Sequence, residues 1–542
     1  MRLCSLPSLS GLLLAATVGA SGLYAQDTQL VSQMLDRVVR QERAFVDRIK
    51  SWSPIVETYL QEMPEASETL RSPLSDHYFL GRLINGSEYT SLLARTDQPK
   101  GSRFARKRGN SMTFLPNGFA QMIYVDSVSF DRNSYTFEYV RREFLREVRC
   151  LVFDVSPVDK KQPGRFIGRI WVEDRDYNIV RSNGTYTNSA PDRLFFHFDS
   201  WRVNVLPGVW IPAYIYVEES GATGKRNSIP RFKGQTRLWA YNTPKNRRLD
   251  ELTSILVESQ NEVKDKSETK DASPLESQRA WERQAEDNIL QRIEKSGLLA
   301  GKGEVDTVLD SVVNNLIVTN GLNIEVHCRV LLTTPLESFA VGHTIVISRG
   351  LLDVLPDEAS LALVLADELA HIALGHRTNT QFAFTNQTMT SDEEMLRRFR
   401  FQRNDAEIAA ASKKAIELLE KSPYSQKLGN AGLFLRSLAE NVARLPNLIR
   451  ANLGNQLCST GTMERFAELV KLAPALDQEK LDQIAALPIG SRIKVDPWSN
   501  QIAMMKNQSL SLLSSRDKMP FEVSPFLLNL TRIETPSAPK TP

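Results

Sequence analysis

The segment from Asp357 to His376 carries the strongest pattern in the chain. Asp357 follows Pro356 and fits the N-cap of a helix. Apolar residues then recur at the spacing of one buried helical face, and the pattern ends at Gly375. These apolar residues are Leu361, Val364, Leu365 and Ile372. The pattern therefore predicts a helix with one face packed against a core.

Three polar residues stand near the end of this predicted helix: Asp367, Glu368 and His371. Positions i and i+4 share a face, so Asp367 and His371 point toward one place. Two ligands one turn apart, with a glutamate directly after the first, form the helix that holds zinc and activates its bound water. Glu368 is therefore a candidate general base, and Asp367 and His371 are candidate metal ligands. Aspartate stands here where that arrangement has its first histidine.

Residues 339–376 read FAVGHTIVISRGLLDVLPDEASLALVLADELAHIALGH. This string resembles the zinc metallopeptidases related to HtpX and the CaaX prenyl protease, and the resemblance extends over about 270–430. It implies that Glu368 is the general base and His371 a zinc ligand. Asp367 departs from the family pattern, because its side chain is shorter than histidine and a harder ligand. The resemblance also implies one zinc ion, held weakly or not at all.

The family takes its third ligand from a downstream glutamate in an ExxAD pattern. Alignment on the helix after it puts Ile408 at the ligand position and Ser412 at the aspartate. Glu407 is one residue away, which is about 100° of helix rotation. Glu407 is therefore either the third ligand or a solvated helix charge. His343 and His376 are the alternative donors, by rearrangement.

Residues 75–257 have the texture of an antiparallel sheet, with alternating strands and Gly or Asn turns. The phrase GRIWVEDRDYNIVRSNGTY, from Gly168 to Tyr186, resembles the strand–turn–strand of LolA/LolB-like lipoprotein-carrier domains. That resemblance implies a half-barrel that binds acyl chains, a lipoprotein or an extended polypeptide. Aromatic residues recur in this region, and we expect them either to line such a cavity or to form an ordinary hydrophobic core. Among them are Phe195, Trp201, Trp210 and Trp239.

We therefore predict a two-domain α+β protein, with a LolA-like curved antiparallel sheet followed by a mainly helical zincin-like domain. The expected boundaries are a signal peptide at 1–25, a helical segment at 26–74, the β domain at 75–257, a charged linker or solvated helix at 258–285, the metallopeptidase-like domain at 286–430, a helical region at 431–532 and a disordered tail at 533–542.

The N-terminus is typical of a secretory signal, with Arg2, an apolar run from Gly11 to Ala20 and small residues after it. No other stretch reaches the ~20 apolar residues of a membrane helix. We therefore expect a periplasmic or otherwise extracytoplasmic protein with no transmembrane segment in the mature chain. The net charge of +3 gives no indication of a nucleic-acid partner. Cys150, Cys328 and Cys458 are too scattered for a disulfide scaffold.

Two hypotheses follow from the altered metal site. In the first, the protein is an exported metalloendopeptidase: a polypeptide of the cell envelope lies along an edge strand at Thr344–Ser348, and Glu368 activates water. In the second, it is a pseudopeptidase that binds peptide or lipid and assists envelope assembly or quality control. A third reading, a lipoprotein carrier with an incidental helical domain, leaves the string at 339–376 unexplained.

Overall fold

The computed structural model describes most of the chain, with side chains from residue 31 onward. The described residues are 13–64, 73–93, 114–188, 195–219, 222–223, 228–229, 231–242, 274–385, 390–457, 466–477, 483–490, 492–505 and 521–534. Residues 1–12, most of the predicted tail and Cys458 lie outside them. Residues 13–25 of the predicted signal peptide form the beginning of α1 (Leu13–Ser51).

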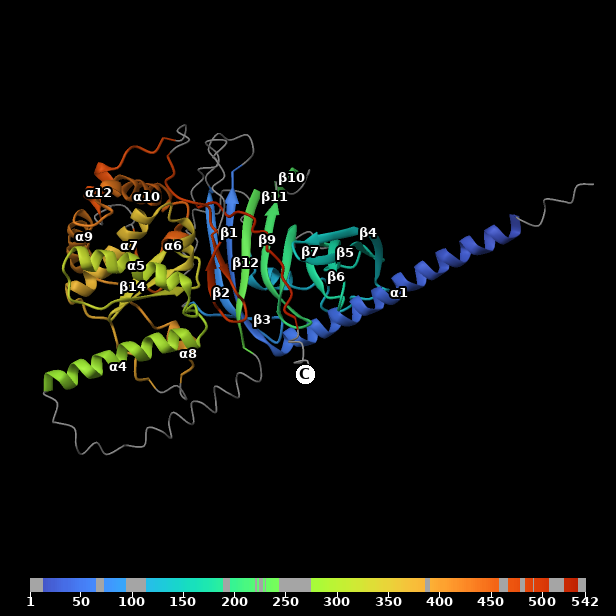
Figure 1. Ribbon diagram of the computed structural model, residues 1–542, viewed down its shortest axis with the longest axis horizontal. Helices are drawn as coiled ribbons and strands as arrows, with labels where there is room; N and C mark the ends of the chain where they lie inside the picture. Colours follow the sequence, from blue (N-terminus) through green and yellow to red (C-terminus); the bar gives the residue numbers. More distant parts are fainter. Residues whose placement is uncertain are drawn as a thin grey trace, which may run out of the picture.

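The N-terminal region is an open ten-stranded antiparallel sheet in the order β3-β2-β1-β12-β9-β8-β7-β6-β5-β4 (Figure 1). Its strands are β1 (Ser53–Met63), β2 (Ser75–Ile84), β3 (Glu88–Ser91), β4 (Tyr135–Leu145), β5 (Val148–Pro157), β6 (Phe166–Glu173), β7 (Ile179–Tyr186), β8 (Phe198–Leu206), β9 (Val209–Glu219) and β12 (Arg231–Asn242). The short pair β10 (Ala222–Thr223) and β11 (Ser228–Ile229) follows β9. The predicted N-terminal antiparallel sheet is confirmed, and it is not closed. Of its predicted range, 75–257, the stretches 94–113, 189–194 and 243–257 lie outside the described residues.

The helix predicted for 26–74 ends at Ser51, and the prediction is wrong for Ser53–Met63, which form β1. This strand is rich in β-branched and aromatic residues, which favour a sheet. Pro54 is tolerated because it stands at the strand's beginning. β1 lies between β2 and β12, so it is a buried strand of the sheet.

Each face of the sheet is covered over much of its width. One face packs on α1 and α2 (Pro116–Gln121), where the buried Arg202 donates to Glu42 at 2.6 and 2.8 Å. The other face shares a continuous apolar core with the C-terminal region. The segment 521–534 also lies against this face, and Phe526 contacts Tyr214 edge to face.

The C-terminal region is mainly helical around a four-stranded sheet in the order β13-β15-β14-β16. Its helices are α4 (Pro274–Lys295), α5 (Glu304–Thr319), α6 (Arg349–Val354), α7 (Glu358–Ala373), α8 (Asp392–Leu396), α9 (Asp405–Glu420), η2 (Ser425–Lys427), α10 (Leu428–Asn441), α11 (Pro446–Ile449) and α12 (Ala467–Leu472). Its strands are β13 (His327–Leu331), β14 (Glu337–Val341), β15 (Thr344–Ser348), β16 (Asn455–Gln456), β17 (Ile493–Val495) and β18 (Ile502–Met504). Within the predicted linker, residues 275–283 belong to α4 and are mostly exposed.

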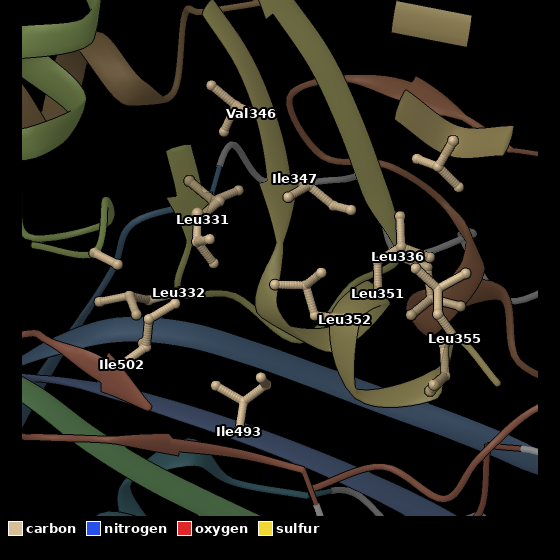
Figure 2. Packing of buried hydrophobic residues seen from close by; sticks show 14 of the residues in the cluster. Leu331, Leu332, Leu336, Val346, Ile347, Leu351, Leu352, Leu355, Ile493 and Ile502 are labelled. Atoms are coloured by element: carbon tan, nitrogen blue, oxygen red, sulfur yellow. The ribbon is translucent and has the colours of Figure 1, made fainter. Parts of the chain in front are cut away.

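The core of this region connects the small sheet to the large one. Figure 2 shows buried residues of β13, β15 and α6 packed with Ile493 and Ile502 from the hairpin β17–β18. Polar contacts cross the same interface. Arg349, at the start of α6, donates to Glu57 of β1 at 2.8 Å, and both side chains are buried. The two regions therefore form one packed unit.

The edge-strand prediction for Thr344–Ser348 is wrong. β15 pairs with β13 on one side, in parallel, and with β14 on the other. Its four consecutive buried residues after Thr344 reflect this central place. A strand with both sides paired has no free backbone groups for a peptide.

Candidate functional site

Helix α7 carries the predicted site, and its local structure follows from its sequence. The side chain of Asp357 accepts a hydrogen bond from the N–H of Ser360 at 2.8 Å, which makes it the N-cap, as predicted. The helix packs against α9, α10 and α5 through its apolar residues. Asp367, Glu368 and His371 lie on its last two turns, and each is 0% exposed.

The three side chains have defined neighbours. Ser338 of β14 donates from its hydroxyl to Oε1 of Glu368 at 2.7 Å. Nδ1 of His371 shares a hydrogen bond of 2.8 Å with Nδ1 of His376, just beyond the helix. Nε2 of His371 is 4.0 Å from Oδ2 of Asp367 and has no hydrogen-bond partner among the described residues. Asp367 and His371 therefore face each other, as the i, i+4 spacing predicts.

Burial shifts the pKa values of Glu368 and His371. It raises the pKa of Glu368 to about 7, against the opposing effects of Ser338, Arg403 and Asn455. It lowers the pKa of His371 to about 3, and the charge of Arg403 adds to this shift. His371 is therefore neutral near pH 7, and Glu368 is able to hold or release a proton there.

Arg403 brings a permanent positive charge to this site. It lies in the loop before α9, and its N–H donates to Oδ1 of Asn455 at 2.8 Å. Its guanidinium donates to the carbonyl oxygens of Arg377 and Ala340. A guanidinium remains charged at any physiological pH. The positive charge of Arg403 therefore opposes the binding of a metal cation close by.

The chain itself covers the site. β16 pairs with β14, with Glu337 opposite Gln456 and Ser338 opposite Asn455. Beside this pair, the ring of Phe401 stacks on that of Phe339, with centroids 4.7 Å apart. The backbone of β14 next to Glu368 is therefore paired to the chain's own residues rather than open to a substrate.

The residues present do not fit a zinc ion. In the part of the chain that the structure describes, no group of three or more His, Cys, Asp or Glu side chains is placed to hold a metal. Glu407 lies in the first turn of α9, where its N–H donates to the N-cap Asn404, and it is half-buried. Ile408 beside it has no ligating atom. A protein zinc site ordinarily has at least three such ligands.

The two alternative histidines do not complete the site either. Nδ1 of His343 lies 3.0 Å from the carbonyl oxygen of Glu325, and this histidine is exposed. His376 contacts His371 directly, so it is a hydrogen-bond partner there. Three further residues contribute to the site without a role predicted from the sequence: Ser338, Arg403 and Asn455. Ser338 directly precedes the string at 339–376, whereas no local pattern marks the other two.

Comparison with known proteins agrees with the resemblance of the central string. Residues 305–426, from α5 to η2, match Peptidase family M48. No curated protein matches the chain. The match includes α7 with Glu368 and His371, and it also includes Arg403 and Ile408. It supports the zinc metallopeptidase family M48 for the part of this chain that contains the candidate site.

Proposed function

We propose that this protein is a non-catalytic relative of the metallopeptidases that holds an extended polypeptide outside the cytoplasm. The burial of Asp367, Glu368 and His371 beneath β16 carries this proposal, because hydrolysis needs a metal ion and a bound peptide at that point. The positive charge of Arg403 beside the histidine further supports a site that does not take up zinc.

The open end of the large sheet supports polypeptide binding. A trough of about 710 Å³ crosses strands β4 to β7, and both charged and apolar side chains line it. In it, Arg169 makes two hydrogen bonds to Asp154, at 2.7 and 3.0 Å. The guanidinium of Arg181 lies 4.3 Å from the ring of Trp171 and 4.4 Å from that of Trp201. Such paired charges and aromatic faces suit peptide groups better than acyl chains.

Strand β4 borders this trough and is one edge of the sheet. It is 11 residues long, and its exposed side chains include Tyr139 and Phe144. An edge strand presents backbone N–H and C=O groups that an extended peptide pairs with as an added strand. The trough and the edge thus offer side-chain and backbone contacts to one client.

A lipid client has less support. The face toward α1 and α2 is filled by aromatic side chains, among them Phe166, Phe198 and Phe232. On the opposite face, Phe526, Leu528 and Leu530 of the C-terminal segment are buried in the core that the two regions share. The positions expected to line an acyl cavity therefore pack against protein.

The N-terminal sequence supports an extracytoplasmic location, through Arg2 and the apolar run that follows. Among the described helices, none is long and apolar enough to cross a bilayer. We propose that the mature chain acts in the cell envelope, on polypeptides that pass through or fold there.

Glu368 favours a second candidate function, that of an active metallopeptidase. Glu368 has a pKa raised to about 7 by burial, which suits a general base at neutral pH. In this second candidate, the protein is an envelope metallopeptidase whose segment at β16 leaves β14 before substrate binds. His371 and Asp367 would be two of the residues that hold its zinc ion, which would supply Lewis-acid chemistry.

Metal analysis, proteolysis and client binding on the full chain separate the two functions. We expect no stoichiometric zinc after dialysis, and casein cleavage no faster than in Glu368→Gln. Stoichiometric zinc that a chelator removes, with cleavage abolished by Glu368→Gln, would overturn the proposal. We also expect labelled casein to bind, and Tyr139→Ser to weaken that binding. Phe384→Ser is the matched control, since Phe384 is 47% exposed and Tyr139 48%.

A further inference from the structure

A second cavity lies between the large sheet and the metallopeptidase-like region. Its volume is about 160 Å³, which is room for more than one water molecule. Half of its lining residues are leucines, and the lining also contains Thr333 and Glu337. Leu80, Leu298 and Leu453 belong to the wall of this cavity, together with the charged Arg400. Asp367, Glu368 and His371 are not among the residues that line it.

Glu337 places a carboxylate in this apolar wall. Its side chain is 1% exposed. Oε2 accepts hydrogen bonds from the N–H groups of Asn452, Leu453 and Gly454, at 2.9, 2.8 and 3.1 Å. Oε1 is buried and has no hydrogen-bond partner among the described residues. One oxygen thus fixes the carboxylate in place, while the other is left for a donor from outside the chain.

Thr333 adds a second acceptor to the same cavity. It is 3% exposed, and its hydroxyl oxygen also has no partner within the described part of the chain. Buried polar atoms without partners are costly, and a charged acceptor is the costliest of them. A ligand that pairs with both atoms must therefore donate a hydrogen bond to the carboxylate oxygen and bear an apolar stem for the leucines, while the hydroxyl accepts or donates as the ligand requires.

We propose that this cavity binds a primary alkylammonium group, which donates to Oε1 of Glu337 and to the hydroxyl of Thr333. An ammonium has three donors and no acceptor, so it matches a carboxylate and a hydroxyl in one place. Its aliphatic chain lies against Leu80, Leu298 and Leu453. The group comes either from a free amine or from a lysine side chain of another polypeptide.

Arg400 is the opposing charge on the cavity wall. This residue is exposed, and its guanidinium donates to the carbonyl oxygens of Arg397 and Phe399, at 3.1 and 2.6 Å. Backbone groups, rather than Glu337, thus hold its guanidinium. Removal of its charge is expected to strengthen ammonium binding two- to threefold. The inference concerns a cavity separate from the trough and does not depend on client binding there.

Calorimetric titration of the full chain with n-butylammonium tests the proposal, with n-butanol as the neutral ligand of the same chain length. We expect saturable binding of the amine and at least tenfold weaker binding of the alcohol. Glu337→Gln should weaken amine binding at least tenfold. Glu325→Gln, a matched change at a side chain that is 87% exposed, should leave it unchanged.

If Glu337→Gln does not fold, Thr333→Val tests the ammonium site instead, because it removes one hydroxyl at nearly constant volume. We expect it to weaken amine binding severalfold, and Arg400→Gln to strengthen it. Nα-acetyl-lysine N-methylamide separates the two sources: binding equal to that of butylammonium indicates a lysine side chain, and weaker binding a free amine. Equal affinity for alcohol and amine, or no saturable binding by folded protein, overturns the proposal and leaves a water-filled cavity.

Discussion

At the scale of single residues, the chemistry of α7 depends on two positions that lie far apart in sequence. The resemblance to the metallopeptidases implies that Asp367 takes the place of a histidine with a shorter side chain, and that Ile408 takes the place of the glutamate ligand. Arg403 brings a positive charge near His371. We expect the residues at 367 and 408 each to weaken metal binding, because together they leave fewer ligands than a zinc site ordinarily has.

We therefore expect Asp367→His and Ile408→Glu to restore zinc binding only in combination. A structural zinc site contributes roughly 10–16 kcal/mol from four ligands, so each ligand is worth on the order of a hundredfold in affinity. Competition with a chromogenic chelator measures the dissociation constant. Asp367→His with Ile408→Gln is the matched control. Tight binding by Asp367→His alone would contradict this prediction and indicate that Glu407 already serves as a ligand.

Asp126 gives the protein a pH-dependent contribution to stability. Burial acts to raise its pKa, but hydrogen bonds from Tyr135, Ser129 and Val128, together with Arg165, outweigh burial and lower it. A carboxyl whose folded pKa is depressed stabilises the fold above its unfolded pKa of about 3.9, and this stability is lost as the pH falls through the folded pKa.

Asp126→Asn should therefore destabilise the protein at pH 7 and do so progressively less below about pH 4. Urea unfolding of both proteins at a series of pH values gives the difference in free energy. Asp36→Asn is the control, because its pair with Arg132 is about half exposed and worth roughly 0–1 kcal/mol. A difference that stays constant down to pH 3 would refute the assignment.

At the scale of elements, the sequence predicted those helices and strands whose residue pattern lies within one segment. The helix from Asp357, its N-cap and the strand at Thr344–Ser348 are all confirmed. The strand at Ser53–Met63 was mistaken for helix, because its apolar and charged residues are mixed at no clear period. Patterns within one segment do not tell which strands become neighbours.

The same limit applies to the site. The i, i+4 spacing placed Asp367 and His371 together, because a helix fixes that geometry locally. Asn455 reaches the site only through the pairing of β16 with β14, which are more than 100 residues apart in sequence. The pairing that covers the site is therefore a tertiary contact, and the residue pattern of α7 does not predict it.

Gly454 makes the approach of β16 to β14 possible. A Cβ at this position would lie 2.4 Å from the carbonyl oxygen of Ser338. Gly454→Ala should therefore loosen the segment 451–457 and increase its cleavage in limited proteolysis. Gly429→Ala is the matched control, since a Cβ there meets nothing within 4 Å and the residue lies in the first turn of α10.

If the segment at β16 conceals an active peptidase, Gly454→Ala should also increase zinc-dependent casein cleavage. The proposed non-catalytic function expects no cleavage even when the segment is loosened. Equal resistance of Gly454→Ala and Gly429→Ala to proteolysis would mean that the glycine is not what permits the pairing.

At the scale of the whole molecule, the large sheet is part of the metallopeptidase-like region's core. One hydrophobic cluster runs from Trp171 and Trp239 of the sheet to Leu363 and Leu369 of α7. The C-terminal segment binds back to the sheet, where Gln61 accepts from the N–H of Val523 at 2.8 Å. Two regions that share one core do not unfold independently.

Glu57 and Arg349 form the buried ion pair that joins the two regions, and the carboxylate also accepts from Thr334 at 2.8 Å. Glu57→Gln leaves a buried guanidinium with less compensation, at a cost of about 3 kcal/mol. Urea unfolding should then show one transition at lower midpoint, coincident by tryptophan fluorescence and far-ultraviolet circular dichroism. Glu62→Gln, on the same strand but one-third exposed, should cost under about 1 kcal/mol. Separate transitions for the two probes would instead mean that the sheet and the helical region are independent domains.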